Sequence, residues 1–535
     1  TDDGIATVRG TLTATTDANN SAITLNQLAV DGAFTLAPHG TGAVTIVNDA
    51  GLELAASTLG GTFSGTATTG HITQSGALAI TGTSTLVTSA DDGTIDLKVS
   101  SITNAFTGKL LITTNDSGSG TDGDVEIDGG TTNLVIGLST IDGDLDLLSG
   151  GTITDDGIAT VRGTLTATTD ASNSAITLNQ LAVDDAFTLA PHGTGAVTIV
   201  NDADLKLAAS TLGGTFSGTA TTGDISDSGN LSITGAATFI TTADGRHIIL
   251  DQPGSVFTST VTMQAGNGSN AAFGNITFVD SADVRLHSSA ESAGDLFIDA
   301  STDLAVGGSL SITATTGNIT QGSEVAVGTT STFTTSANNA TITLNDEDNA
   351  FTGALTLTTY GSGGNATLDN GTTALIVAQS SVGGNLTLTS GHASGITDSG
   401  TVTVGGDFSA TTDANNGDID MGTLAVTGTI TLTTNDAANN NTGHATVVNA
   451  TQVVLAGSSI DGNFSATATT GNITDSGALT ITGTSSFTTS ANNATITLND
   501  ADNAFTGALT ITTNDNDNPV DGTYAADVTI DGGTT

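Results

Sequence analysis

Long tandem repeats are the feature that most constrains how this chain can fold. Residues 1–72 recur almost letter for letter at 154–225, a shift of 153 residues. A second block, FTTSANNATITLND, begins at Phe333 and again at Phe487, a shift of 154 residues. Each copy of such a repeat buries its apolar face against the next copy, so the sequence predicts a stack of similar units.

A short marker divides each large repeat into two related halves. The marker reads Ile-Thr/Ser-Asp/Gln and begins at Ile72, Ile153, Ile225, Ile319, Ile396 and Ile473. We expect one continuous repeat array over residues 1–535. The expected modules are two related double modules at 1–153 and 154–318, a third at 319–472 and a partial fourth at 473–535. Neither end resembles a polar capping repeat, so we expect the segment to belong to a longer array.

A finer period of 22 or 23 residues predicts the fold class. Its unit is a small residue, a large apolar residue and then Thr or Ser, as at Phe34, Phe63 and Leu86. Within 427–433, hydroxyl side chains alternate with Gly, Ile and Leu, which is the two-residue period of a half-buried strand. Clusters such as Asn338-Asn339 punctuate these strands with turn formers. We expect an all-β protein, a β-solenoid wound as a right-handed parallel β-helix with about 22 residues per coil.

Composition and charge exclude several partners. The chain has 54 acidic and 7 basic residues, for a net charge of −47, whereas nucleic-acid binding needs Lys and Arg against phosphate. We therefore expect no nucleic-acid partner, and attraction to cations instead. There is no cysteine, which excludes disulfides and thiolate chemistry. No run of about 18 apolar residues occurs, so we expect no membrane-spanning helix.

Acidic strands supply the candidate metal sites. In TDGDVEIDGG, alternation places four acidic residues on one strand face, and the segment about one coil later places three more in the same way. If the two strands are neighbours, the carboxylates lie about 5 Å apart, and a cation would relieve their repulsion. Oxygen ligands suit Ca²⁺, and a solvated acidic face is the alternative. The candidate ligands are Asp122, Asp124, Glu126, Asp128, Asp142, Asp144 and Asp146, with a second loop at Asp515, Asp517 and Asp521.

No catalytic site is expected. A catalytic site is usually a singular departure from its repeats, and residues 244–300 are the most divergent stretch. It carries Arg246, His247, Arg285, His287 and Glu291, which we interpret as an irregular, loop-bearing coil. Thr and Ser recur beside the apolar markers because Thr suits exposed strand positions, and a flat ice-binding face is the alternative. The sequence requires no cofactor beyond the candidate Ca²⁺.

Two segments carry a family resemblance. SSVGGNLTLTSGHASGITDSGTVTVGGDFSATT (380–412) and STLGGTFSGTATTGHITQSGALAITG (57–82) resemble repeats of large bacterial exoproteins, namely filamentous-haemagglutinin-like and autotransporter-passenger adhesins. The resemblance implies a right-handed β-helix that is secreted or displayed at the cell surface. It also implies binding to surfaces, to host cells or to other copies.

The expected function is therefore structural or adhesive. We expect an extracellular rod or fibre segment that acts as a spacer, a surface-binding shaft or a filament body. Twenty-odd coils at about 4.8 Å each would span on the order of 100 Å. The expected partners are other copies, end to end or laterally, and a cell surface, extracellular matrix or polysaccharide. A polysaccharide-binding or -cleaving β-helix is the alternative, although only 2 Tyr and no Trp are present to stack on sugars.

Overall fold

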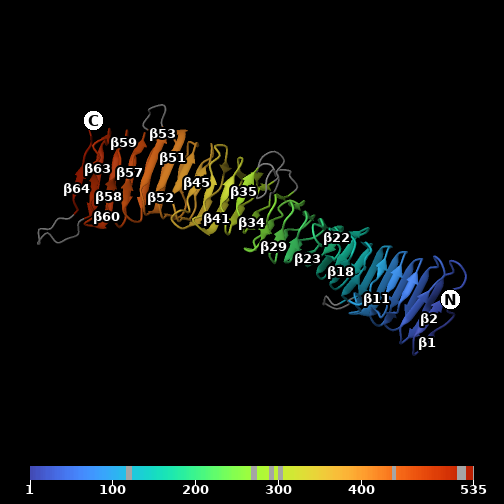
Figure 1. Cartoon of the computed structure of the whole chain (residues 1–535). Coiled ribbons are helices and arrows are strands. Elements are labelled where there is room, and N and C mark those ends of the chain that lie inside the picture. The colour runs from blue at the N-terminus through green and yellow to red at the C-terminus, as the bar shows by residue number, and fades with distance from the viewer. Residues whose placement is uncertain are drawn as a thin grey trace. The chain divides into compact units, whose positions relative to one another are not determined.

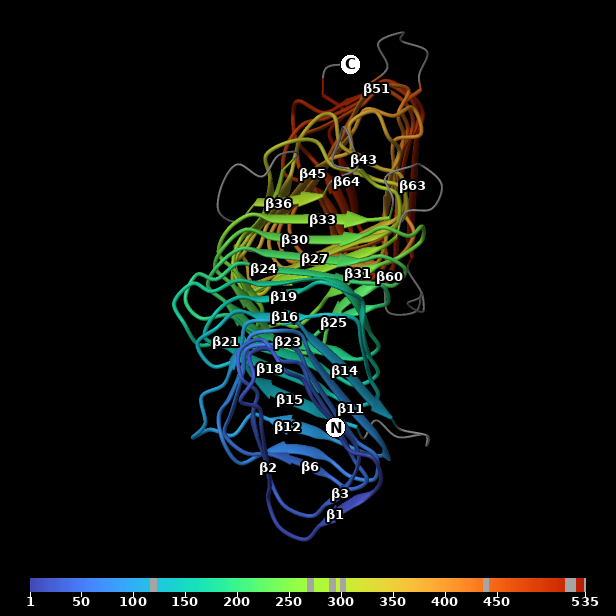
Figure 2. The ribbon, with the colours of Figure 1, turned by 90° about the vertical axis from the view of Figure 1, so that its right-hand side faces the viewer.

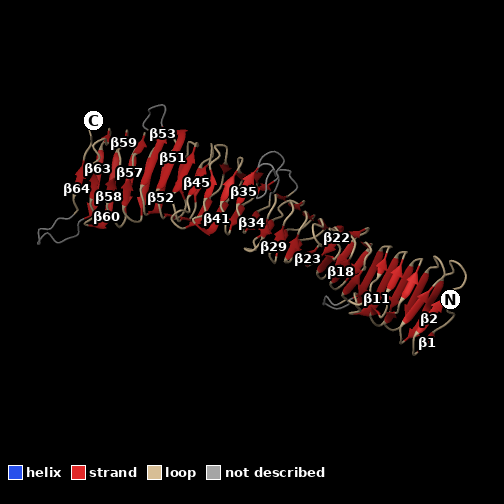
Figure 3. Ribbon diagram, viewed as in Figure 1, coloured by secondary structure: helices blue, strands red, loops and turns tan. Residues whose placement is uncertain are grey.

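The computed structural model confirms an all-β parallel solenoid of about 21 turns with ~22 residues per turn. It describes residues 1–115, 123–266, 274–287, 295–298, 305–435, 442–514 and 526–533, and these form strands and loops without a helix (Figure 3). By their contacts the coils fall into two compact units, Thr1–Asn267 and Gly268–Thr535. The right-handed winding and the module boundaries stay predictions.

A coil of the first unit has three short strands joined by turns. In one coil these are β8 (Phe63–Ala67), β9 (Ile72–Gln74) and β10 (Leu78–Ile80). Each pairs in parallel with its counterpart in the next coil, respectively β11 (Ser84–Asp91), β12 (Ile95–Leu97) and β13 (Ala105–Phe106). Two of these sides belong to long sheets, whereas the third side carries separate three-stranded sheets, such as the one made by β7 (Ser57–Leu59), β10 and β13. Figure 1 shows this winding, and Figure 2 shows strands of one sheet, β12, β15 (Val125–Asp128) and β18 (Leu145–Ser149), side by side.

Alternating side chains fill the interior of the first unit. Phe34, Phe63 and Leu86 are at most 1% exposed, which confirms the expected inward direction of the apolar markers. Phe239 lies between two other rings, with its centroid 5.2 Å from that of Phe216 and 6.2 Å from that of Phe257. Such tilted and edge-on contacts add to the stabilisation from burial. The core is thus a narrow column of stacked aliphatic and Phe side chains.

A glycine makes room for a Phe ring at one inward position of the first unit. Gly218 points inward on β27 (Phe216–Ala220), and a Cβ there would lie 2.8 Å from Phe216 Cζ and from Leu205 Cδ2. Gly218 is also in register with Phe239 of the next coil. The Phe-Ser-Gly-Thr-Ala pattern therefore fits one large side chain and one missing side chain into the same layer.

The second unit repeats this construction. One of its sheets runs through in-register strands, and Leu386, Phe408 and Ile430 occupy one buried row. Phe487 lies 5.6 Å from Phe464 and 6.0 Å from Phe505 between ring centroids. The strands of this sheet that matter below are β39 (Ile319–Gln321), β42 (Ile342–Leu344), β45 (Ala366–Asp369), β48 (Leu386–Ser390), β51 (Phe408–Asn415) and β53 (Ile430–Asn435).

Asn residues form tight turns, as the sequence predicts. Asn339 adopts a left-handed conformation with a φ of 66°. Asn tolerates this region better than other residues that carry a side chain. The same conformation recurs at Asn20, Asn173, Asn416 and Asn493.

Candidate functional site

The acidic strands lie next to each other, which meets the condition on which the sequence prediction depended. β15 pairs with β18 so that Glu126 faces Asp146 across the ladder. On its other side β15 pairs with β12, which brings Asp96 opposite Glu126. Three carboxylates therefore follow one another in neighbouring coils, and we call Asp96, Glu126 and Asp146 the acidic column. Asp96 was missed in the sequence, because its place depends on the register between coils.

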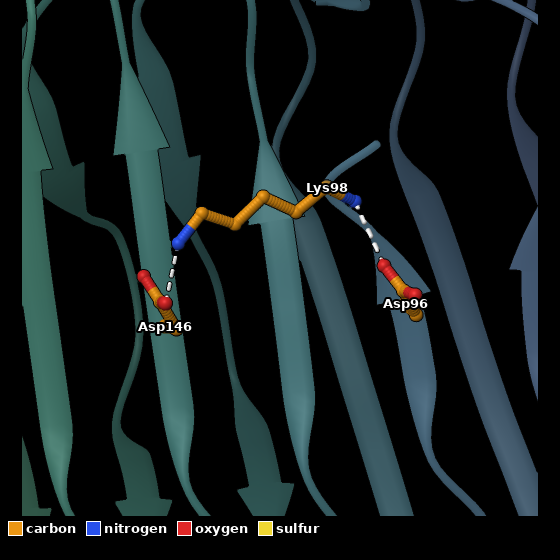
Figure 4. A network of polar contacts seen from close by, with 3 residues as sticks. All are labelled: Asp96, Lys98 and Asp146. Atoms are coloured by element: carbon orange, nitrogen blue, oxygen red, sulfur yellow. Dashed lines mark hydrogen bonds and ion pairs between the residues drawn. The ribbon is translucent and has the colours of Figure 1, made fainter. Parts of the chain in front are cut away.

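Basic side chains of the chain itself relieve part of this charge. Lys98 Nζ bonds to Asp146 Oδ2, while the Lys98 backbone N–H donates to Asp96 Oδ1 at 3.1 Å (Figure 4). Arg162 Nη1 lies 3.2 Å from Oδ1 of the buried Asp142. An internal ammonium or guanidinium group thus occupies the role that the sequence analysis gave to a cation.

The calcium sites stay a prediction. Among the described residues, no group of three or more His, Cys, Asp or Glu side chains is arranged to hold a metal ion. Asp122, Asp515, Asp517 and Asp521 lie outside those residues. Asp128 accepts a hydrogen bond from the Gly130 N–H at 2.7 Å, within its own turn.

Asp124 and Asp144 belong to a corner ladder rather than to the acidic column. Asp124 Oδ1 accepts the Asp144 N–H at 2.8 Å, and Asp144 Oδ1 accepts the Thr164 N–H at 2.6 Å. Each side chain thus binds the backbone of the next coil at a corner where the strands begin. The same bond recurs at the pairs Asn20–Thr41, Asn173–Thr194, Asn365–Asn385, Asn385–Asp407, Asp407–Thr429 and Asn463–Thr484.

Within this ladder, Asp407 shows the electrostatic effect. Its Oδ1 accepts the Thr429 N–H at 2.8 Å and the Thr429 hydroxyl at 2.9 Å. These two donors lower the pKa of Asp407 below its usual value. The corner carboxylates are therefore explained by the fold, without a ligand.

The third residue of the sequence marker has a structural role that the sequence did not reveal. Asp155 Oδ2 accepts the N–H of Gln180 at 2.6 Å, and Asp398 Oδ2 accepts that of Thr423 at 2.6 Å. Both donors lie where the strand register shifts, so the marker carboxylate fastens a bulge in the next coil. Asp2 holds Gln27 in the same way. Burial raises the pKa of Asp155, while the N–H groups that it accepts act in the opposite direction.

A second kind of loop is fastened by an Asn-Ala-Phe triplet. In this loop a buried Asn, 1% exposed, donates its amide to the marker residue of the preceding coil. The bonds are Asn104 to Gln74 Oε1 at 2.9 Å, Asn349 to Gln321 Oε1 at 3.0 Å and Asn503 to Asp475 Oδ2 at 2.7 Å. The recurrence of Asn-Ala-Phe was the available signal in the sequence.

A further set of buried Asn side chains replaces missing backbone bonds. Asn201 is 0% exposed, and its Oδ1 accepts the Val183 N–H at 2.8 Å. Its Nδ2 donates to Val183 O at 2.9 Å and to Asp204 O at 2.6 Å. Asn48 and Asn449 make the equivalent bonds in their own coils. These amides satisfy backbone groups at a bend where no strand pairs.

Hydroxyl groups cover the outward face of one sheet in the second unit. Half-buried or exposed side chains in successive coils are in register there. The first column is Thr320, Thr343, Thr367, Thr387, Ser409 and Thr431, and the second is Thr389, Thr411, Thr433, Ser459 and Thr480. Asp369 stands in register with Thr389 at the start of the second column, so the face combines hydroxyl groups with a carboxylate.

A shallow groove of ≈ 470 Å³ lies on another sheet of this unit. Its lining is entirely uncharged and consists of Thr358, Gln379, Ser380, Ser381, Thr401 and Thr403. Tyr360, which is 52% exposed, follows Thr358 by two residues on β44 (Leu355–Tyr360). The groove is thus lined by polar, uncharged side chains, and Tyr360 lies outside the lining on the strand that carries Thr358.

The divergent stretch contains a part-buried ion pair. Arg285 Nη1 lies 3.0 Å from Asp295 Oδ1, and the Asp295 side chain is fully buried. Arg285 and His287 belong to the second unit, whereas Arg246 and His247 belong to the first. Glu291 lies outside the described residues. The basic residues that lie close together in the sequence thus belong to two different units of the structure.

Comparison with known families identifies the repeats. The model of the family described as repeats of unknown function (DUF5649) matches residues 41–113, 122–189, 194–264, 289–358, 363–422 and 442–512. Each match contains one of the six Ile-Thr/Ser-Asp/Gln markers. No curated protein and no solved structure matches the chain. In the part of the chain that the structure covers, no helix is long and apolar enough to cross a membrane.

Proposed function

Since the chain belongs to the family of repeats of unknown function (DUF5649), we propose its role from its own structure. It acts as a structural or adhesive segment of a large secreted or cell-surface bacterial protein, serving as a spacer, a surface-binding shaft or a filament body. The observation that carries this proposal is the way in which successive coils within each unit are joined.

Successive coils are joined by strand pairing along more than one side of the stack. In the first unit, β24 (Val197–Asn201) and β27 share five registered residue pairs, from Val197–Phe216 to Asn201–Ala220. Corner side chains and marker carboxylates add bonds between the same coils, as described above. Separating two coils would require hydrogen bonds in more than one sheet to break at the same time. Such resistance to pulling suits a mechanical, structural role.

The outward face supports an adhesive role. The hydroxyl columns of the second unit repeat one hydroxyl-bearing surface from coil to coil. The net charge of −47 opposes non-specific aggregation of neighbouring copies. The extracellular and bacterial parts of the proposal rest on the resemblance of segments 57–82 and 380–412 to exported adhesins.

Negative-stain electron microscopy of the purified chain tests the structural role. We expect slender particles of even width, either single or joined into fibres. Compact globular particles would overturn the proposal. Binding of fluorescently labelled chain to bacterial and host cells then separates a shaft that adheres from a plain spacer.

Polysaccharide binding is the second candidate, and the groove beside Tyr360 favours it. A sugar ring could stack on Tyr360 while the groove hydroxyls donate and accept hydrogen bonds. Titration with soluble polysaccharides, monitored by calorimetry, tests this candidate. We expect Tyr360→Ala to lose the signal and Tyr360→Phe to keep it, and absence of any signal in the unmodified chain rules this candidate out.

A further inference from the structure

One of the four loops that follow the Asn-Ala-Phe design departs from it. Residues 255–257 read Ser-Val-Phe, where the other three loops have Asn-Ala-Phe. Ser255 keeps one function of the missing Asn, because its Oγ accepts the Leu231 N–H at 3.1 Å. In the intact design Asn503 Oδ1 accepts the Leu479 N–H at 2.8 Å. A hydroxyl is shorter than an amide, however, and does not reach the marker residue.

The marker residue of this loop is Asp227, and it lacks the amide donor. Asp227 Oδ1 accepts the Asp251 N–H at 2.9 Å, as Asp475 Oδ1 accepts the Asn499 N–H at 3.0 Å. Asp227 Oδ2 is buried and has no hydrogen-bond partner among the residues that the structure describes. The corresponding oxygen of Asp475 is held by Asn503 Nδ2 at 2.7 Å and by the Asp500 N–H at 3.1 Å. The change to Ser at position 255 thus removes the side-chain donor, which makes the shorter of these two bonds.

A buried carboxylate without its donor is costly when it is ionised. Asp227 is 8% exposed, and burial raises its pKa to about 6, while the N–H groups of Asp251 and Gln252 act in the opposite direction. The Asp251 carboxylate adds like-charge repulsion. Lys206, on the adjoining β25 (Leu205–Leu207), does not neutralise the negative charge of Asp227, because its Nζ donates to Asp184 O at 2.8 Å.

We propose that the protonation state of Asp227 controls the local opening of the 251–255 loop. The loop is stably closed when Asp227 is protonated, and it opens more readily when Asp227 ionises. The direction of this pH dependence follows from the raised pKa of Asp227. Below pH 3.8 Asp227 carries the proton in both the folded and the unfolded state, so its ionisation costs the closed loop no free energy. The penalty grows between pH 3.8 and about 6, and is fully present above it. The device is local, because the other three loops keep their amide.

Hydrogen exchange of the whole chain, resolved by mass spectrometry, tests the proposal. Protection factors of segment 247–257 are compared with those of segment 495–505, the matched loop with Asn503. If opening of the loop exposes Asp227, the protection factors of segment 247–257 should fall about fiftyfold from pH 4 to pH 7. This fall should exceed any change in segment 495–505. A wild-type loop that tracks the control across this range overturns the proposal.

Two variants separate the cause. Ser255→Asn with Val256→Ala restores the Asn-Ala-Phe triplet and should remove the excess pH dependence. Asp227→Asn cannot ionise and should remove it as well. An unchanged control segment shows that the variants are folded. Persistence of the excess pH dependence in either variant contradicts the assignment to Asp227 and its missing partner.

Discussion

Asn201→Ala removes an amide that stands in for backbone pairing between two coils. Asn201 is fully buried on β24 and makes three hydrogen bonds, two with Val183 and one with Asp204 O. The alanine leaves the N–H and C=O of Val183 and the C=O of Asp204 without these partners. It also leaves a gap of the size of an amide group.

The expected cost follows from these losses. A buried polar group left unsatisfied costs about 1–3 kcal/mol, and water entering from the nearby turn offsets part of it. Three such groups give an expected loss of about 3–5 kcal/mol in the free energy of opening of this coil. Asn48, the same position one repeat earlier, makes the same three bonds, so Asn48→Ala should cost as much in its own coil. The free-energy losses of the two single variants should add in the double variant.

Hydrogen exchange is the suitable assay, because a repeat stack need not unfold in a single step. Protection around Val183 and Asn201 reports the local opening free energy in the full chain. Asn179→Ala, an exposed residue on β22 (Ile176–Val183), is the control and should change it by less than about 0.5 kcal/mol. If Asn201→Ala costs no more than Asn179→Ala, the reasoning about buried amides is refuted.

Three further predictions concern the core, the acidic column and the corner ladder. Phe239→Ala, at a fully buried ring between two others, should lower the opening free energy of its coil by about 3–5 kcal/mol, measured by the same exchange; a loss below about 1 kcal/mol contradicts the stacked core. Lys98→Met removes the ammonium bonded to Asp146, so millimolar Ca²⁺ should raise the melting temperature of this variant more than that of Lys109→Met; equal responses would count against the acidic column. Asp407 should titrate by NMR with a midpoint below 3.8, and its stabilisation should be present above that pH and lost as pH falls through the folded pKa; a midpoint at or above 3.8 contradicts the ladder bonds.

The sequence predicted what depends on local alternation. The two-residue period correctly placed Phe34, Phe63 and Leu86 in the core, and the spacing of the acidic segments by about one coil agrees with the pairing of β15 and β18. Both inferences need only the direction of a side chain and the approximate length of a coil.

Contacts between coils could not be predicted, because register depends on loop lengths that vary along the chain. Lys98 reaches Asp146 across 48 residues and an intervening strand. Asn is a residue type that is common in exposed turns, yet Asn201 is buried. The backbone groups that it binds are brought next to it only by the fold, so the sequence did not reveal its role. The change from Asn to Ser at Ser255 is visible in the sequence, but its meaning requires the position of Asp227.

Spin-label distances within the first unit test the central claim that each coil lies directly on the one before it. Thr154, Thr177, Thr198, Ser217, Thr238 and Thr262 are in register in consecutive coils. The chain has no cysteine, so pairs of introduced cysteines can be labelled uniquely. With one label at Thr154 and the second at Ser217, Thr238 or Thr262, the separation measured by electron–electron double resonance should grow by about 4.8 Å per coil. Separations that do not increase regularly in this series would contradict the stacked solenoid.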